Sequence, residues 1–256
     1  MRSDMVKELN ENTHNFNKIA LTNSVTLDWQ YRPRLGVLEQ SLTKMVIQKI
    51  KNSDKGQFEF KDMNDNDILN RIWPQKIQGK NPIKYIIDHS FGRPRDFVMF
   101  LNVVKAMYPE KETITPHMMK AALKEYSTLF YAELMNEINR NENKALIMSS
   151  LTLLKDTGKN TFCLKELETT FNISPGRYQS IENVDDIKQG VKELYSYSII
   201  GSSKKVGQGP NGYRQVEYQY RNNAIDNPNL SGHFSIHFAL RAVLNVGDNT
   251  KKENVI

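Results

Sequence analysis

Apolar residues recur at helical spacing through residues 34–156, where polar or proline-containing breaks separate one run from the next. The run in residues 34–52 follows a three- and four-residue rhythm that only Lys49 interrupts, which predicts an amphipathic helix. Pro82 and Pro116 suit the first turn of the helices that follow them. The same spacing predicts helices in residues 68–73, 83–90, 97–104, 116–138 and 144–155. This part of the chain therefore predicts a helical lid or bundle with little strand.

The pattern changes close to residue 159. A short apolar segment, residues 162–164, precedes a helical pattern in residues 165–171, and a second helical pattern covers residues 184–197. A loop rich in Gly and Lys then leads into alternating apolar and polar positions in residues 213–220, which predicts the second strand of a wing. Strand, helix, helix and two-stranded wing is the order of a winged helix-turn-helix module.

The last patterned segment alternates like a strand in residues 234–236 and has helical spacing in residues 238–244. His233 and His237 stand four residues apart, a spacing that suits a metal on a continuous helix. Because a strand-to-helix break falls between them and no carboxylate is near, we expect no metal site. The strand is instead predicted to return to the wing sheet.

These changes divide the chain into four parts. The fold class is predicted to be mainly α, with a helical domain in residues 34–156 and a winged-helix domain with a small β-wing in residues 157–246. Residues 1–33 precede the helical domain, and the polar residues 247–256 are predicted to be a disordered tail.

A tight corner between two helices is predicted at residues 89–96. Gly92 can end one helix in a left-handed conformation, and Pro94 can then occupy the first turn of the next. Arg93 and Arg95 flank this proline, so two guanidinium groups are held at a rigid position. We name residues 89–96 the arginine corner.

Two interpretations of the arginine corner are open from spacing alone. In the first, Arg93 and Arg95 pair with carboxylates such as Asp88 or Asp96 and only fix the corner. In the second, one of them reaches an anion such as a nucleotide phosphate, which a guanidinium fork recognises well.

Composition is that of an ordinary globular chain. Hydrophobic residues make up 39% and charged residues 25% of the 256 residues, and the mean hydropathy is −0.59. Without an apolar run long enough to cross a membrane, or a signal peptide, we expect a cytoplasmic protein with no membrane partner. Cys163 is the single cysteine, which excludes an internal disulfide and disfavours a cysteine-based zinc site.

A net charge of +6 permits nucleic acid as a partner without requiring it. In a winged helix, the second helix enters the major groove and the wing contacts phosphates. Acidic residues dilute the charge of the predicted second helix, so protein or intradomain packing remains an alternative to DNA. The residues predicted to contact nucleic acid are Lys188, Lys192, Lys204, Lys205 and Arg214.

The segment HSFGRPRDFVMFLN, residues 89–102, resembles the R-P-R-D segment of FunZ-like bacterial P-loop ATPases related to the AAA and STAND groups. Residues 2–5 resemble the segment that follows the Walker B strand in that family, and residues 24–29 resemble the passage that leads into the lid. Residues 194–201 and 234–244 resemble its tail. The resemblance implies a nucleotide-binding core, then a helical lid and a winged-helix tail.

The phosphate loop of that family is absent from this sequence, as is an apolar strand ending in paired acids. We therefore expect no catalytic residue and no cofactor in this chain alone; ATP and Mg²⁺ are implied only with a core encoded upstream or on another chain. By the resemblance, residues 1–33 are a remnant of that core or a connection from it. Arg2 would then lie near the nucleotide, Arg93 and Arg95 would sense it, and the protein could form a homo-oligomer.

Two functions follow. One is the regulatory lid and winged-helix portion of a P-loop ATPase, which relays the state of the nucleotide to a DNA or protein partner. The other is a stand-alone DNA-binding regulator that uses the winged helix. An enzyme active in this chain alone ranks third, since no catalytic set can be assembled from the sequence.

Overall fold

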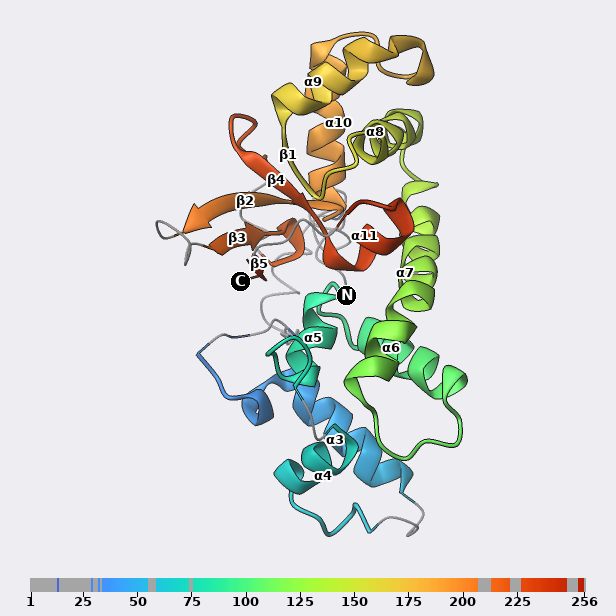
Figure 1. The fold of residues 1–256 in the computed structure, drawn as a ribbon, viewed down its shortest axis with the longest axis vertical. Helices are drawn as coiled ribbons and strands as arrows, with labels where there is room; N and C mark the ends of the chain where they lie inside the picture. The colour runs from blue at the N-terminus through green and yellow to red at the C-terminus, as the bar shows by residue number, and fades with distance from the viewer. Residues whose placement is uncertain are drawn as a thin grey trace.

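The structure is a computed structural model that describes residues 13, 29, 32, 34–54, 59–73, 76–206, 213–221, 227–247 and 253–255. The molecule is elongated (Figure 1), with α3 (Ser41–Ser53) and α4 (Asp65–Ile72) at one end. Helices α8 (Lys144–Asp156), α9 (Leu164–Ile173) and α10 (Val184–Ser196) lie at the other end. A small sheet and the long helix α7 (Pro116–Ile138) occupy the middle. The prediction of a mainly helical fold with a small sheet is confirmed.

Helices of the first part begin where a side chain caps them. Asn64, Asn81 and Thr115 each accept a backbone N–H at the start of α4, α5 (Pro82–Asp88) and α7. Proline fills the first turn of α5, α7 and α6 (Pro94–Met107). The predicted helix 34–52 differs from the structure, because a 3-10 turn, η1 (Val37–Glu39), precedes α3. The buried Gln40 side chain holds that bend by donating to the Arg32 and Leu35 carbonyl oxygens.

The second part alternates helices with short strands. After α8 come β1 (Thr161–Cys163), α9, the turn η2 (Pro175–Arg177) and α10. The remaining elements are β2 (Ile200–Val206), β3 (Tyr213–Glu217), η4 (Gln219–Arg221), β4 (His233–Ile236), α11 (Phe238–Leu244) and β5 (Glu253–Val255). The sheet order is β1-β4-β2-β3-β5. The predicted return of residues 234–236 to the sheet is confirmed, with β4 antiparallel to both β1 and β2.

The segment after α11 differs from the predicted disordered tail. Gly247 forms a bridge with Lys159, and β5 pairs in parallel with β3, so that residues 214–216 lie beside residues 253–255. Pairing with a strand edge gives these backbone groups hydrogen-bond partners that a polar sequence does not reveal.

Helix α7 joins the two parts, because it packs against both α6 and α11 (Figure 1). The Ser127 hydroxyl of α7 donates to the Ala239 carbonyl and accepts the Val243 N–H at 3.3 Å. Buried apolar side chains from both predicted domains form one continuous cluster. Within the described ranges, no helix is long and apolar enough to cross a membrane.

Gly190 lets α10 approach α8 closely. A Cβ added at this position would lie 2.0 Å from the Ser150 Oγ and 3.1 Å from the Ser150 Cβ, and Ser150 is buried. We predict that Gly190→Ala lowers the free energy of unfolding by about 1–3 kcal/mol, although alanine is the better helix former. Urea unfolding measures the change.

The control for this prediction is Gly176→Ala, where an added Cβ meets no atom within 4 Å. Ser150→Ala removes the nearer clashing atom, so the cost of Gly190→Ala should be smaller in that background. An unchanged cost in both backgrounds would contradict the close approach of α8 and α10.

Candidate functional site at the arginine corner

The predicted corner is present between α5 and α6. Gly92 adopts a left-handed φ of +67°, and Pro94 stands in the first turn of α6. Arg93 is the N-cap residue of α6, so its extended backbone turns the chain into the helix. These two residues determine the local geometry, because only glycine adopts positive φ at little cost and proline presets φ for a first helical turn.

Both arginines of the corner pair with carboxylates of α7. The Arg93 Nη1 lies 3.1 Å and the Arg95 Nη2 lies 3.2 Å from the same oxygen, Glu137 Oε1. The Arg95 Nη2 also lies 3.4 Å from Glu133 Oε2. The Arg93 and Arg95 side chains are 33% and 54% exposed, so solvent reaches both guanidinium groups.

The first interpretation of the corner, in which the arginines pair with carboxylates, gave Asp88 and Asp96 as examples of partners. Asp88 is instead buried between Lys80 and Lys84, which hold its pKa below the ordinary value against the opposing effect of burial. Asp96 Oδ1 lies 3.6 Å from the Arg95 Nε. The main partners, Glu133 and Glu137, come from another helix. The only sequence signal for them is that two glutamates four residues apart share one face of α7.

Asp96 closes the corner from inside. Its side chain is 1% exposed, and its Oδ2 accepts the Phe91 N–H at 3.1 Å. Burial raises the pKa of Asp96 from 3.8 to about 6, and Arg93 and the hydrogen bond from Phe91 oppose this rise. The Asp96 carboxylate therefore holds the backbone of the corner through this hydrogen bond, although burial destabilises its ionised form.

The space in front of the arginines is small. The hollow bounded by Arg93, Arg95, Glu133 and Glu137 has a volume of about 10 Å³, near the lower limit for one water molecule. With Asp96 ionised, the two arginines and three carboxylates carry a net charge of −1. A phosphate can therefore take the place of Glu137 between the two guanidinium groups only if that glutamate moves away.

The corner also contacts the part of the chain that follows β3. The Tyr220 hydroxyl donates to the Ser90 carbonyl at 3.3 Å, and the ring centroids of Tyr220 and Phe91 are 5.3 Å apart. Gly92 faces the same ring, since a Cβ added there would lie 3.9 Å from a Tyr220 carbon. The arginine corner is therefore in direct contact with the segment that follows β3, and a structural change at the corner would affect that segment.

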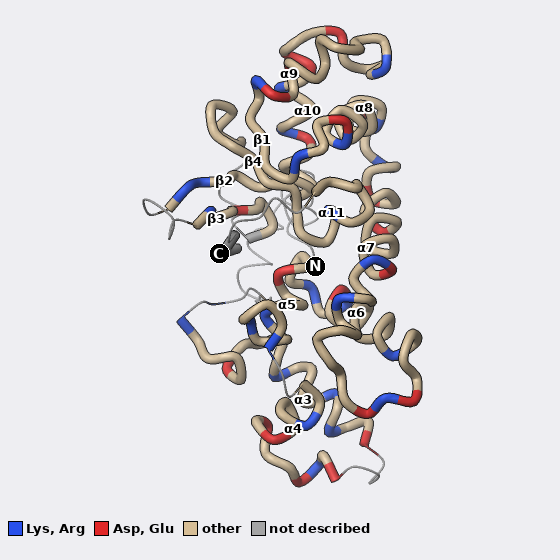
Figure 2. The backbone as a smooth tube through the Cα atoms, viewed as in Figure 1, with Lys and Arg blue, Asp and Glu red and all other residues tan. Residues whose placement is uncertain are grey.

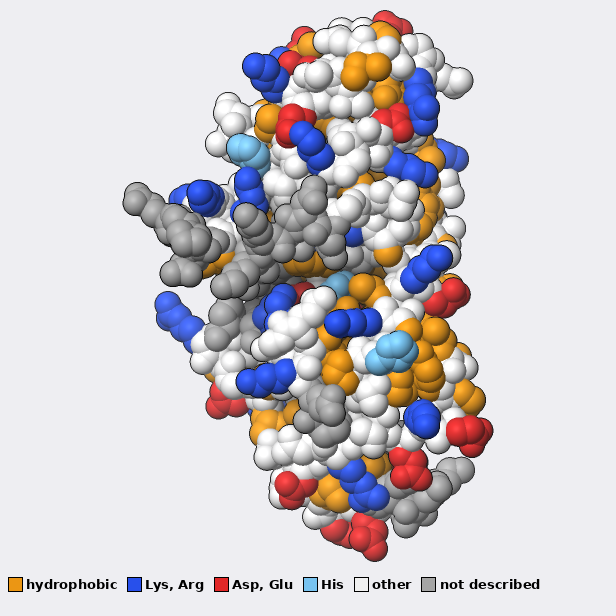
Figure 3. Space-filling model, viewed as in Figure 1, with side chains coloured by type: hydrophobic (Ala, Val, Ile, Leu, Met, Phe, Trp, Pro, Cys, Tyr) orange, Lys and Arg blue, Asp and Glu red, His pale blue; other side chains and the backbone are white. Residues whose placement is uncertain are grey.

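The residues predicted to contact nucleic acid fall into two groups. Lys204 and Lys205 are exposed on β2, and Lys205 lies opposite Arg214 of β3, whose neighbour on β5 is Glu253. Figure 2 shows Lys and Arg positions near the end of β2, and Figure 3 shows basic side chains on the same side of the molecule. Lys188 and Lys192 instead belong to α10, and the Lys188 Nζ lies 2.7 Å from Asp185. Arg2 lies outside the described residues.

Among the described residues, no group of three or more His, Cys, Asp and Glu side chains is arranged to hold a metal ion. The predicted break between His233 and His237 is confirmed, because His233 starts β4 and His237 caps α11. His237 is buried, and its Nδ1 accepts the Ala239 N–H at 3.3 Å.

Stability should depend on pH through Asp96. The folded state keeps its proton up to about pH 6, whereas the unfolded state releases it near pH 3.8, so this group's contribution to stability falls as pH rises between those values. We predict that Asp96→Asn removes that fall. Relative to the parent chain, the free energy of unfolding of the variant should rise by about 2–3 kcal/mol between pH 4 and pH 7.

Urea unfolding at both pH values measures this difference, with Asp62→Asn as the control at an exposed position. A difference between Asp96→Asn and the parent that stays constant with pH would show that Asp96 does not titrate in this range.

Comparison with known families gives one match to the helical domain. The family model described as the FunZ-associated C-terminal helical domain matches residues 40–135, which are 96 of the 256 residues. The matched range runs from the start of α3 into α7 and contains the arginine corner. No curated protein and no solved structure matches the chain. The first helical part of this chain is therefore similar to a domain associated with FunZ.

Proposed function

We propose that this chain is the lid and winged-helix regulatory portion of a FunZ-like P-loop ATPase. In this role it senses nucleotide held by a core outside the described residues and relays that state to a DNA or protein partner. The observation that carries the proposal is the position of the arginine corner. It lies within the range similar to the FunZ-associated domain and contacts Tyr220 of the second part.

The ion pairs of the corner suggest how sensing would work. Arg93 and Arg95 share one oxygen of Glu137, so neither guanidinium has that oxygen to itself. A γ-phosphate offers several charged acceptor oxygens and would compete with Glu137 for both arginines. Release of Glu137 would loosen α7 from α6, and the Ser127 contacts would transmit the change to α11.

The arrangement of the second part supports a winged helix. The order α8, β1, α9, α10, β2 and β4, with β4 between β1 and β2, matches that of a winged helix in which β3 extends the wing. Helix α10 would then be the second helix of the helix-turn-helix pair. Its buried face packs on α8, which leaves Lys188 and Lys192 together with Asp185 and Glu193 on partly or fully exposed positions.

We predict that Arg95→Ala lowers ATP turnover at least about tenfold when this chain is combined with its P-loop core, since an arginine near a transferring phosphoryl group commonly contributes more than that. Steady-state turnover and nucleotide affinity measure the effect. Arg140→Ala, at an exposed position just after α7, is the matched control. Turnover and affinity that are unchanged in both Arg93→Ala and Arg95→Ala would contradict nucleotide sensing.

The second candidate function, DNA binding without an ATPase, is favoured by the exposed Lys204 and Lys205 on β2. Lysines on a wing contact phosphates, and each such contact releases condensed counterions. DNA binding through this wing would therefore show little preference for base sequence, and its affinity would depend strongly on salt concentration.

We predict that Lys204→Ala/Lys205→Ala reduces the slope of log affinity against log salt by about 2 for a short labelled duplex. Fluorescence anisotropy over a range of salt concentrations measures the slope. The control is Lys155→Ala/Lys165→Ala, which removes two exposed lysines outside the wing. If the parent chain shows no binding at low salt, or the wing variant keeps the parent slope, the wing is not a DNA contact.

A further inference from the structure

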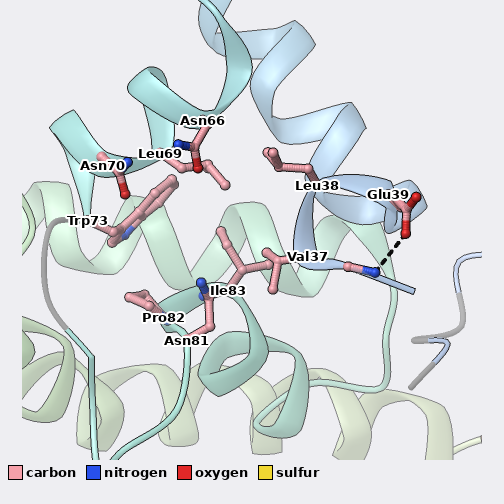
Figure 4. Close-up of a pocket in the computed structure, with 11 residues that line it drawn as sticks. Val37, Leu38, Glu39, Asn66, Leu69, Asn70, Trp73, Asn81, Pro82 and Ile83 are labelled. Atoms are coloured by element: carbon pink, nitrogen blue, oxygen red, sulfur yellow. Dashed lines mark hydrogen bonds between the residues drawn. The ribbon is translucent and has the colours of Figure 1, made fainter. Parts of the chain in front are cut away.

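A cleft of about 410 Å³ lies between η1, α4 and α5, within the helical domain. Leu38 comes from one wall, Asn66, Asn70 and Trp73 from the facing wall, and Asn81 from the start of α5 (Figure 4). It contains none of the residues of the arginine corner, so an inference about it is independent of the function proposed above.

Carboxamides are the distinctive polar groups of this cleft. Asn66 and Asn70 are exposed, stand one turn apart on α4 and face the same side (Figure 4). Neither side chain hydrogen-bonds to another part of the chain that the structure describes. The Asn81 Oδ1 accepts the Ile83 N–H at 2.9 Å. Each free carboxamide offers both a donor and an acceptor to a ligand.

Trp73 adds a buried donor to the same wall. Trp73 is 5% exposed, and its indole Nε1 has no hydrogen-bond partner among the described residues. Buried N–H groups normally find an acceptor, because leaving one unpaired costs free energy comparable to a lost hydrogen bond. Because this Nε1 atom is itself buried, the indole N–H lies within the wall and does not reach a ligand in the cleft.

The charge and exposure of the lining restrict the class of ligand. Among the described residues that line the cleft, Glu39 is the one charged residue, and none is Lys, Arg or His. A phosphate-bearing nucleotide or nucleic acid would therefore meet a negative charge and no cation from these residues. Because the Trp73 ring is buried, its face is not available for stacking a base or a sugar ring.

Spacing then points to a polypeptide backbone. Positions four apart on an α-helix rise by about 6 Å. Every second residue of an extended chain repeats at about 6.6–6.8 Å. Two carboxamides at this interval can each donate to a carbonyl and accept from an N–H of alternate residues in one extended segment.

We propose that the cleft binds an extended segment of a partner polypeptide through its main chain. Asn66 and Asn70 hold alternate residues of that segment, and Glu39 favours neutral or basic residues over acidic ones. Val37, Leu38 and Leu69 supply the apolar surface against which the intervening side chains lie.

The test uses the full chain and a phage-displayed library of random peptides. We expect selection to yield peptides whose affinity, measured by fluorescence anisotropy with the synthetic peptide, falls at least about tenfold for Asn66→Ala/Asn70→Ala, the loss of hydrogen bonds at two residues. Asn102→Ala/Asn172→Ala, which removes two exposed asparagines elsewhere, should leave affinity unchanged. Thermal unfolding of both variants should match that of the parent, since all four side chains are exposed.

N-methylation of successive peptide amides separates main-chain binding from side-chain binding. Loss of affinity at every second position supports the proposal, because only alternate amides face the carboxamides. A selection that yields no peptide sensitive to Asn66→Ala/Asn70→Ala overturns it, as does a methylation profile without this period. Binding of ATP or a single-stranded oligonucleotide with the same dependence on Asn66 and Asn70 also overturns it.

Discussion

The packing of five rings between the two parts of the molecule is the constraint on which the rest of the structure depends. Phe91 lies 4.7 Å from Phe130 and 5.0 Å from His237 between ring centroids, and His237 lies 4.8 Å from Tyr218. Tyr220 completes this aromatic seam by packing on Phe91. Rings in contact at these distances contribute beyond the area that they bury. The seam ties the arginine corner and α7 to residues 218–220, which follow β3, and to the N-cap of α11, so the arginine corner cannot move without disturbing it.

Local structure was predictable where one short stretch of sequence determines it. Helix α7 occupies the range 116–138 expected from its spacing, and Gly92 and Pro94 form the expected turn. The predicted helix 34–52 was too long, because the Gln40 side chain replaces helical hydrogen bonds with contacts to Arg32 and Leu35. A buried polar side chain that bonds backbone groups several residues earlier leaves no periodic signal in the sequence.

The candidate sites depend on contacts that sequence spacing does not reveal. Arg93 and Glu137 are 44 positions apart, and only the packing of α6 on α7 brings them together. The cleft likewise joins residues 36–39, 66–73 and 81–83. Trp73 was predicted only as the end of a helical pattern, since burial of its ring and the lack of a partner for its N–H arise from tertiary packing. The ion pairs of the arginine corner and the lining of the cleft could therefore be identified only from the tertiary structure.

Proton uptake should accompany any anion that reaches the corner. Glu133 already raises the pKa of Asp96, whereas Arg93 and Arg95 lower it. An anion paired with the arginines would reduce their stabilising effect on the Asp96 carboxylate and add a negative charge nearby, so the pKa of Asp96 would rise further above 6. By linkage, protonation of Asp96 would in turn favour the anion, because it reduces the net charge of the cluster from −1 to zero. If the arginines exchange a glutamate for a phosphate as proposed, the buried acid that orders the corner would therefore also set the pH range of that exchange.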